Sequence, residues 1–275
     1  MLERLRSSGW PNLVGEETPD QTLSSTLMRG LDILGLFSDR ETSLTNAEIA
    51  RRLDLNRATV SRLCKTLVHT GFLRRAARGG FQLAPRILAL SYPLLATTRW
   101  RHEMTAPMRE LAEMSGGNVT LAAISGTRFV QLQALGNPAG FPHVPEPGIS
   151  GPLHLAASGR ALLSLLSDAA LSDMFATLHF DDPEGFDAHA QDTVEAIERC
   201  RTEGFCSAYG GWRPSIAALS APIGISPDGL EIALSCGTPR YRARPDEMES
   251  DLGPRMAEAA RTLRETGQFI SPHER

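Results

Sequence analysis

The sequence predicts an α+β fold with an N-terminal winged helix-turn-helix, a linker helix and a C-terminal domain built on an antiparallel sheet. Two short helices with capping signals occur within residues 45–69, and a hairpin pattern follows them. Further along, strand patterns alternate with helices without a regular β-α-β order, which favours an antiparallel sheet. We therefore predict the winged domain over 21–84, the linker helix over 85–100 and the C-terminal domain over 101–275, after a mobile tail over 1–20.

The composition restricts the class of protein. The 275 residues are 41% hydrophobic and 22% charged, as in ordinary globular proteins, so a collagen-like or disordered chain is excluded. No apolar run approaches the roughly 20 residues that cross a bilayer, and the four cysteines lack the spacing of a disulfide framework. A membrane protein and a small secreted scaffold are therefore excluded, and we expect a cytoplasmic protein.

The charge is distributed unevenly along the chain. Residues 21–100 contain 12 basic and five acidic residues, a net charge of +7. Residues 101–275 contain 14 basic and 23 acidic residues, a net charge of −9. A basic module on an acidic body is typical of nucleic-acid-binding proteins. A chance cluster of surface arginines would give the same count, so the charge alone does not establish nucleic-acid binding.

Three helices are predicted before residue 70. The first begins near Ser24 or Ser25 and carries an apolar stripe that includes Leu27 and Leu31. The second begins with a capping box, because Thr45 is followed three residues later by Glu48. The third begins after Asn56, a residue type that caps helix N-termini well, and ends near His69.

The third helix has two contrasting faces. One face is apolar and is centred on Val60, Leu63 and Leu67. The other combines small side chains, which allow a helix to enter the major groove, with basic side chains that can contact guanine or phosphate. The candidate DNA-binding residues of this face are Arg57, Ala58, Thr59, Ser61, Arg62 and Lys65.

A β-hairpin is predicted after this helix. The alternating segments 72–74 and 81–83 flank a turn that contains Gly79 and Gly80. Such a wing meets the phosphate backbone in winged helix-turn-helix domains. The arginines predicted to project from it toward phosphate are Arg74, Arg75 and Arg78.

The remaining elements follow from apolar periodicity. The stretch from Pro85 to Thr97 predicts a helix kinked at Pro93, which we interpret as a linker and dimer contact. Strands are predicted over 119–124, 129–135, 216–225 and 230–236, with a loop over 136–152. Helices are predicted over 101–114, 157–167, 168–177 and 190–203, and after Pro245.

Several motifs resemble the IclR-type bacterial transcriptional regulators. The resemblance rests on 26–34, on the helix-turn-helix sequence from Leu44 to Leu63, and on Ser158 to Leu163 with Pro152 shortly before it. It covers nearly all of residues 25–265. It implies a GAF-like C-terminal domain that binds a small-molecule effector, and a homodimer or dimer of dimers on a palindromic operator in double-stranded DNA.

The resemblance also implies an effector site. Relatives that sense small acids hold them with backbone N–H groups near the positions of Ala157 and Ser158, and with an acidic residue, a cysteine and two serines. This chain has other residues at most of these positions, so we expect a more apolar pocket that suits an aromatic or bulky ligand. The candidate effector-binding residues are Ala157, Ser158, Tyr209, Trp212, Ala218, Leu234 and Cys236.

Two alternatives to a DNA-binding regulator are an enzyme domain and an adaptor without regulatory DNA binding. The sequence contains no H-E-x-x-H pair, no phosphate-binding loop and no G-x-S-x-G elbow, and Cys200 and Cys206 lack zinc-site spacing. We therefore expect no catalytic residue, no metal and no cofactor. We expect the Cys200 thiol to be buried. His154 could orient a ligand, but a structural role is the more frequent one for a histidine in such a position. An adaptor would show no salt-dependent DNA binding.

Overall fold

The structure is a computed structural model that describes residues 23–136, 144–265 and 268–270. Its described part divides after Thr97 into an N-terminal unit and a C-terminal unit. The predicted tail over 1–20 lies outside the described residues. The predicted linker helix therefore falls mainly in the N-terminal unit, whereas the boundaries at 84 and 100 stay predictions.

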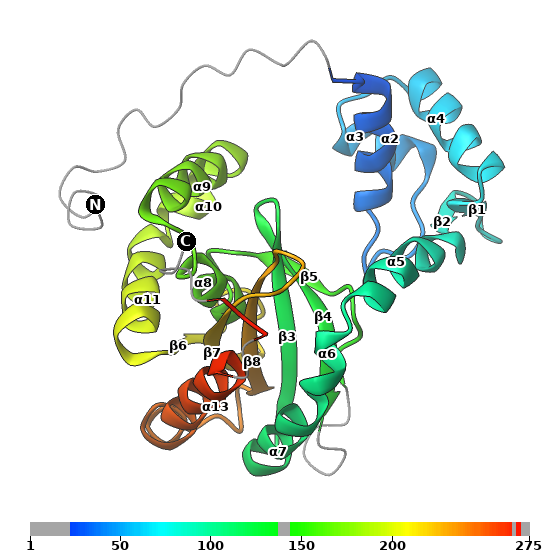
Figure 1. Ribbon diagram of the computed structural model, residues 1–275. Helices are drawn as coiled ribbons and strands as arrows, with labels where there is room; N and C mark the ends of the chain where they lie inside the picture. Colours follow the sequence, from blue (N-terminus) through cyan, green and yellow to red (C-terminus); the bar gives the residue numbers. More distant parts are fainter. Residues whose placement is uncertain (1–22, 137–143, 266–267, 271–275) are drawn as a thin grey trace. The chain divides into compact units, whose positions relative to one another are not determined.

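The N-terminal unit consists of helices around one small core and a two-stranded hairpin (Figure 1). Its elements are α2 (Ser25–Gly35), α3 (Asn46–Arg52), α4 (Arg57–His69), β1 (Leu73–Arg75), β2 (Phe81–Leu83) and α5 (Arg86–Thr97). The predicted winged helix-turn-helix is therefore observed. The helix predicted after Pro85 is also observed, with Pro93 inside α5.

The predicted caps fix the starts of these helices. The Ser24 side chain accepts a hydrogen bond from the first turn of α2. At α3 the capping box is complete, because the Glu48 N–H donates to Thr45 Oγ1 (3.3 Å) and the Thr45 N–H donates to Glu48 Oε2 (2.7 Å). At α4 the Thr59 N–H donates to Asn56 Oδ1 (2.8 Å). Each cap satisfies a backbone donor that has no partner within the helix.

The hairpin packs on the helices through alternate residues. β1 and β2 pair antiparallel, and Leu44 extends them by bridging to Phe81. Gly80 must be glycine here, because its φ is +83° and a Cβ would lie 2.6 Å from the Leu44 carbonyl oxygen. Leu44, Leu73 and Phe81 are buried in the same core as Val60.

The C-terminal unit is built on a six-stranded antiparallel sheet with the order β5-β4-β3-β8-β7-β6. The strands are β3 (Asn118–Ser125), β4 (Arg128–Gly136), β5 (Ser150–Pro152), β6 (Cys206–Tyr209), β7 (Ile216–Ile225) and β8 (Glu231–Pro239). The helices are α6 (Trp100–Glu103), α7 (Thr105–Ser115), α8 (Ala157–Leu163), α9 (Asp168–Asp181), α10 (Pro183–Asp187), α11 (Ala190–Glu203), α12 (Pro245–Glu247), the π-helix η1 (Met248–Leu252) and α13 (Gly253–Glu265).

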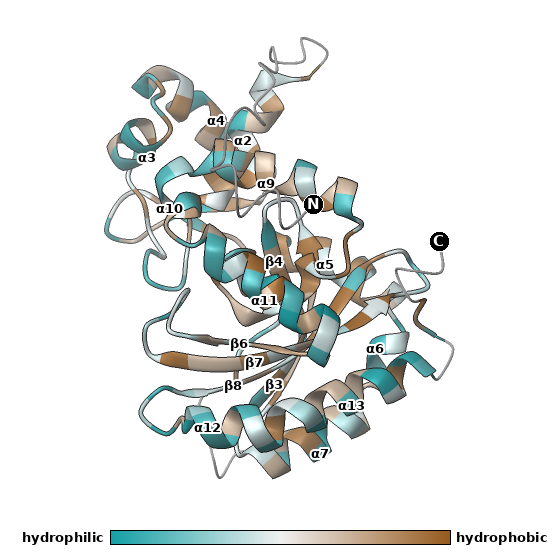
Figure 2. Ribbon diagram, turned by 90° about the vertical axis from the view of Figure 1, so that its left-hand side faces the viewer, coloured by the Kyte–Doolittle hydropathy of each residue, from teal (hydrophilic) through white to brown (hydrophobic). Residues whose placement is uncertain are grey.

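Each face of this sheet has its own apolar cluster. One cluster joins the sheet to α7 and α13, and the other joins it to α8, α9 and α11. Figure 2 shows α11 on one side of the sheet and α7 and α13 on the other, with hydrophilic residues on the outer faces of the helices. The observed layers confirm the predicted α+β class.

Several details differ from the expectations, and residues 137–143 of the loop predicted over 136–152 lie outside the described residues. The helix predicted over 101–114 is interrupted at Met104 and forms α6 and α7. The helix predicted over 157–167 ends at Leu163, because Ser167 caps the next helix by accepting from the Ala170 N–H. The short edge strands β5 and β6 were not predicted, since three or four residues carry too little periodicity to detect. No helix in the described ranges is long and apolar enough to cross a membrane.

Candidate nucleic-acid interface and ligand cavity

The polar face of α4 lies on the surface. Its candidate residues Arg57, Ala58, Ser61, Arg62 and Lys65 are exposed, and Thr59 is half-buried. On the opposite face of the helix Val60 and Cys64 are fully buried, and Leu67 is half-buried. The apolar face therefore holds the helix against the core, and the arginine-bearing ridge is exposed on the surface of the N-terminal unit.

The hairpin arginines are exposed but point to different faces. Arg75 lies on the same face as the buried Leu73, and its guanidinium sits 4.5 Å from the centre of the Phe81 ring. Arg74 lies opposite Gln82 on the other face, where it lines a groove with the segment Phe37–Thr42. Successive residues of a strand alternate in direction, so the side chains of Arg74 and Arg75 leave the hairpin on opposite faces.

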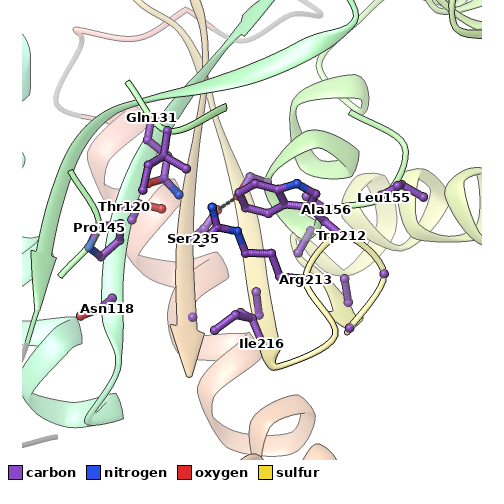
Figure 3. Close-up of a pocket in the computed structure, with 18 residues that line it drawn as sticks. Asn118, Thr120, Gln131, Pro145, Leu155, Ala156, Trp212, Arg213, Ile216 and Ser235 are labelled. Carbon is purple, nitrogen blue, oxygen red and sulfur yellow. Dashed lines mark hydrogen bonds between the residues drawn. The ribbon is translucent and has the colours of Figure 1, made fainter. Parts of the chain in front are cut away.

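A cavity of about 250 Å³ opens in the C-terminal unit, between the α8 face of the sheet and the loop that joins β6 to β7. Four of the candidate effector residues line it: Ala157, Ser158, Trp212 and Ala218. Figure 3 shows Trp212 and Arg213 on one side of the cavity, and Thr120 and Gln131 reaching in from β3 and β4 on the other.

Three candidate effector residues lie outside this cavity. Leu234 and Cys236 point to the other face of the sheet and pack in the cluster with α7 and α13. Tyr209 also packs against that cluster, and its hydroxyl donates to Glu249 Oε1 (3.1 Å). Each of the three lies one position away from a residue that lines the cavity, and side-chain alternation puts such neighbours on opposite faces of a strand.

Their neighbours line the cavity instead. On β8 the cavity residues are Ser235 and Gly237, and on β6 the cavity residue is Ala208. The alternation of Leu234 and Cys236 with Ser235 could have shown this, because the larger apolar side chains belong to the core face. Arg213 had no recognisable signal in the sequence, since its position depends on the shape of its loop.

The loop that carries Trp212 and Arg213 is tightly packed. Gly210 has a φ of +87°, and a Cβ on Gly211 would lie 2.6 Å from the Leu155 carbonyl oxygen. The Trp212 ring stands edge-on to Phe129, with centroids 5.1 Å apart at 88°. The Arg213 guanidinium lies 4.5 Å from the centre of the Trp212 ring. This packing places an aromatic ring and a cation at the cavity wall.

The lining is mainly apolar, with a few polar groups. Its polar side chains are those of Asn118, Thr120, Gln131, Ser158, Arg213 and Ser235, and no acidic side chain lines it within the described part of the chain. Ser158 Oγ and Ser235 Oγ are 2.8 Å apart, as are Ser235 Oγ and Ser220 Oγ. A small, mostly apolar cavity with one cation and a few fixed hydroxyls suits an organic anion better than a bare inorganic ion.

His154 precedes the cavity in sequence but does not line it. Its ring is 4% exposed and packs edge-on against Phe186 at 5.5 Å. Neither ring nitrogen has a hydrogen-bond partner among the described residues. Burial lowers the pKa of His154, the neighbouring His189 and Arg160 lower it further, and Asp182 opposes them. The residue therefore has a structural place, with a neutral ring.

This burial predicts an acid-sensitive C-terminal unit. Above about pH 6.5, the unperturbed value, His154 is neutral in both states and contributes no pH dependence. As the pH falls below 6.5, the unfolded chain takes up the proton first, so the free energy of unfolding falls by up to about 1.4 kcal/mol per pH unit. We expect urea unfolding at pH 7.5 and 5.5, followed by fluorescence of Trp100 and Trp212, to show this loss.

The variant His154→Phe keeps an aromatic ring of similar shape and removes the titration. Its free energy of unfolding should fall less between pH 7.5 and 5.5 than that of the unmodified chain. An identical pH dependence in both proteins would contradict the assignment.

The four cysteine thiols are buried. All four cysteines are free, and no cluster of three or more metal-ligating side chains occurs in the ranges that the structure describes. Burial raises the pKa of the Cys64 and Cys236 thiols to about 11, and it also raises the pKa of Cys200. These thiols are therefore protonated near neutral pH and poorly reactive.

Comparison with known proteins decides the family. The IclR helix-turn-helix domain matches residues 26–77, and the C-terminal domain of bacterial IclR transcriptional regulators matches residues 94–265. The chain belongs to the IclR family. Members of the IclR family are transcriptional regulators rather than enzymes, with a DNA-binding helix-turn-helix and a C-terminal ligand-binding domain.

Individual relatives are similar over most of the chain. An IclR family transcriptional regulator from Brucella abortus has 27% sequence identity and a TM-score of 0.80, over 97% of this chain and 98% of its own. The Pca regulon regulatory protein of Pseudomonas putida is 22% identical over 90% of this chain and 85% of its own. An IclR homolog from Microbacterium hydrocarbonoxydans, solved in complex with 4-hydroxybenzoate, shares the fold at 20% identity and a TM-score of 0.62, over 88% of this chain and 100% of its own.

Proposed function

We propose that this IclR-family chain binds a palindromic operator in double-stranded DNA through the exposed ridge of α4. The observation that carries the proposal is the ridge itself, because its arginines are exposed while Val60 and Leu63 anchor the helix from behind. The contact residues that we propose are the six on α4 and the three hairpin arginines named above. Because such an operator would lie on the chromosome, we propose that the chain acts in the cytoplasm.

A homodimer, or a dimer of dimers, fits both a palindromic site and the surface of the N-terminal unit. α5 has no buried residue, although its sequence is largely apolar. Its exposed apolar side chains are Leu88 (73%), Leu90 (63%), Tyr92 (73%) and Leu94 (48%). On α2, Leu27 and Leu31 are also more than half exposed, although they belong to the predicted apolar stripe. A second copy of the chain is the partner that we propose for these faces, because an isologous interface has the two-fold symmetry of a palindrome.

The cavity of the C-terminal unit is the proposed effector site. Its volume of about 250 Å³, the Trp212 ring and the Arg213 cation favour an aromatic carboxylic acid. The 4-hydroxybenzoate complex of the Microbacterium homolog supports this class of ligand. We propose that its binding changes the affinity of the N-terminal unit for the operator. Footprinting of the DNA upstream of the chain's own gene, with and without a panel of aromatic acids, tests both the binding to an operator and its change by the ligand.

Substitution of the arginines distinguishes base reading from phosphate contact. Arg62→Ala is expected to weaken binding to the operator by about 1–3 kcal/mol and to relax the base preference, with a smaller effect on random DNA. Arg75→Ala is expected to weaken operator and random DNA by similar factors and to reduce the slope of log K against log salt by about 1. Fluorescence anisotropy at several salt concentrations measures both.

Arg74→Ala is the matched comparison for Arg75→Ala, because the two residues are neighbours on opposite faces of the hairpin. An equal loss for Arg62→Ala on operator and random DNA would mean that Arg62 only contacts phosphate. An absence of salt-dependent DNA binding by the unmodified chain would favour an adaptor and overturn the proposal.

A further inference from the structure

The first residue of α5 is bonded to the end of the recognition helix α4. We infer that Arg86 is a positioning residue for operator binding, because its side chain fixes the direction in which α5 leaves α4. The inference rests on the proposed function, in which α4 reads DNA and α5 joins two copies of the chain. It assigns to Arg86 a control over the spacing between the two half-sites that a dimer accepts.

The first step is the end of α4. Its last turn closes as a Schellman motif, in which the Gly71 N–H donates to the Val68 carbonyl (3.1 Å) and the Phe72 N–H donates to the Leu67 carbonyl (2.9 Å). Gly71 has a φ of +79°, as this motif requires. These bonds satisfy two of the carbonyl groups that a helix leaves without partners at its C-terminus. The carbonyl of the C-cap residue Thr70 is not one of the two and needs a different donor.

The second step is the donor that this carbonyl receives. Arg86 is the first residue of α5, and its Nη1 donates to the Thr70 carbonyl oxygen (2.6 Å). The Arg86 guanidinium carbon also lies 5.2 Å from the centre of the Phe72 ring, which is within the range of a cation–π contact. Because the negative end of the α4 dipole lies at Thr70, a cation is favoured there. Arg86 therefore binds the C-terminus of α4 and the ring that follows it.

The third step is how few other contacts fix the direction of α5. No residue of α5 is buried, and none belongs to the apolar core of the N-terminal unit. Its half-buried residues lie four positions apart on one face: Ile87, Ser91 and Leu95. The Ala84 N–H donates to the Phe72 carbonyl oxygen (2.9 Å), which brings the chain to the start of α5. The contacts of Arg86 come directly after this bond, so they act on the angle between α5 and α4.

This angle matters because a dimer must place two recognition helices on DNA at the same time. Half-sites one helical turn apart are separated by about 34–36 Å, and one added base pair moves a half-site by about 3.4 Å and turns it by about 34°. A dimer whose α4 helices are held firmly against α5 tolerates such a change poorly. Without the Arg86 link each α4 can swing, so the dimer should lose its preference for one spacing while each α4 still fits its own half-site.

The test measures DNA binding of the full chain by fluorescence anisotropy. The duplexes are the operator found by footprinting, the same operator with one base pair added or removed between the half-sites, a single half-site, and random DNA. The unmodified chain is expected to bind the operator about tenfold or more tightly than either spacing variant. Arg86→Gln is expected to lose about five- to tenfold on the operator and to keep a spacing preference of about threefold or less. Its affinity for the single half-site should change by less than about twofold, because α4 itself is intact.

Two further variants locate the effect. Phe72→Leu removes the ring beside the guanidinium but no charge, so it should also reduce the spacing preference, and it should add less than about twofold to the effect of Arg86→Gln. Arg40→Gln is the matched control, because it removes the same charge from an exposed position of the same unit, and it should keep the preference. Protection of α3 and α4 from hydrogen exchange checks that each variant is folded. If Arg86→Gln loses this protection, Phe72→Leu decides.

Failure of the inference is distinguishable from failure of the proposed function. A spacing preference that Arg86→Gln retains in full would overturn the inference. An equal loss on operator, half-site and random DNA, with the slope of log K against log salt reduced by about 1, would also overturn it and would mark Arg86 as a phosphate contact. An unmodified chain that binds all spacings equally would overturn it too. All three results leave DNA binding in place, whereas an unmodified chain without salt-dependent DNA binding would overturn the proposed function and the inference together.

Discussion

Replacing Val60 by aspartate is expected to unfold the N-terminal unit and to leave the C-terminal unit folded. Val60 is fully buried in the core that joins α2, α3, α4 and the hairpin. An unpaired carboxylate in an apolar core costs several kilocalories per mole. That is comparable with the whole stability of a small domain, about 5 kcal/mol at the lower end. The chain should therefore lose DNA binding completely.

Hydrogen exchange followed by mass spectrometry measures this effect in each unit separately. Peptides from α3 and α4 should lose protection in Val60→Asp, whereas peptides from β7 and β8 should keep it. Ser61→Asp is the matched control, because it places the same charge one residue away on the exposed face. It should fold normally and still bind DNA poorly, through repulsion by phosphate. Full protection of α4 in Val60→Asp would contradict the described core.

The second large effect is expected for Gly159→Ala. A Cβ on Gly159 would lie 2.2 Å from the Leu153 carbonyl oxygen and 2.4 Å from its Cα. Both are backbone atoms, so no side-chain rotation relieves the clash, and α8 must move away. We expect a loss of about 3 kcal/mol in the free energy of unfolding, at the upper end for overpacked sites. Ser158 moves with the helix, so ligand binding should be lost as well.

Gly30→Ala is the control for this variant. Gly30 also lies inside a helix, but a Cβ there would meet nothing within 4 Å. Because alanine is a better helix former than glycine, this change should stabilise the N-terminal unit by about 0.5–1 kcal/mol. Urea unfolding of the two variants should therefore give effects of opposite sign. A mild effect of Gly159→Ala would mean that α8 does not pack on Leu153 as described.

Local signals predicted the N-terminal unit well. The capping box at Thr45 and the cap at Asn56 act within four residues, so the sequence alone contains their full geometry. The same holds for the burial of Val60, which follows from helical periodicity. The long strands of the C-terminal unit were also predicted, because eight to ten alternating or apolar residues leave a clear pattern.

The candidate site was only partly predictable, because it depends on contacts between distant segments. Ser158, Ser220 and Ser235 meet only after β7 and β8 pair and α8 packs on the sheet. The alternation of Leu234 and Cys236 with Ser235 indicates that they share one face of β8, but which face borders the cavity depends on where α8 packs on the sheet. The position of Arg213 depends on a loop held by Gly210 and Gly211, whose close contacts are not encoded locally.

The division of the chain after Thr97 has a consequence for how such regulators diversify. The two units have separate apolar cores, and the junction falls between the last residue of α5 and the start of α6 at Trp100. Gene fusions made at this junction should therefore produce chimeras that keep the operator of one parent and answer to the metabolite of the other. Recombination at one short segment can thus rewire a genetic circuit without redesigning either module.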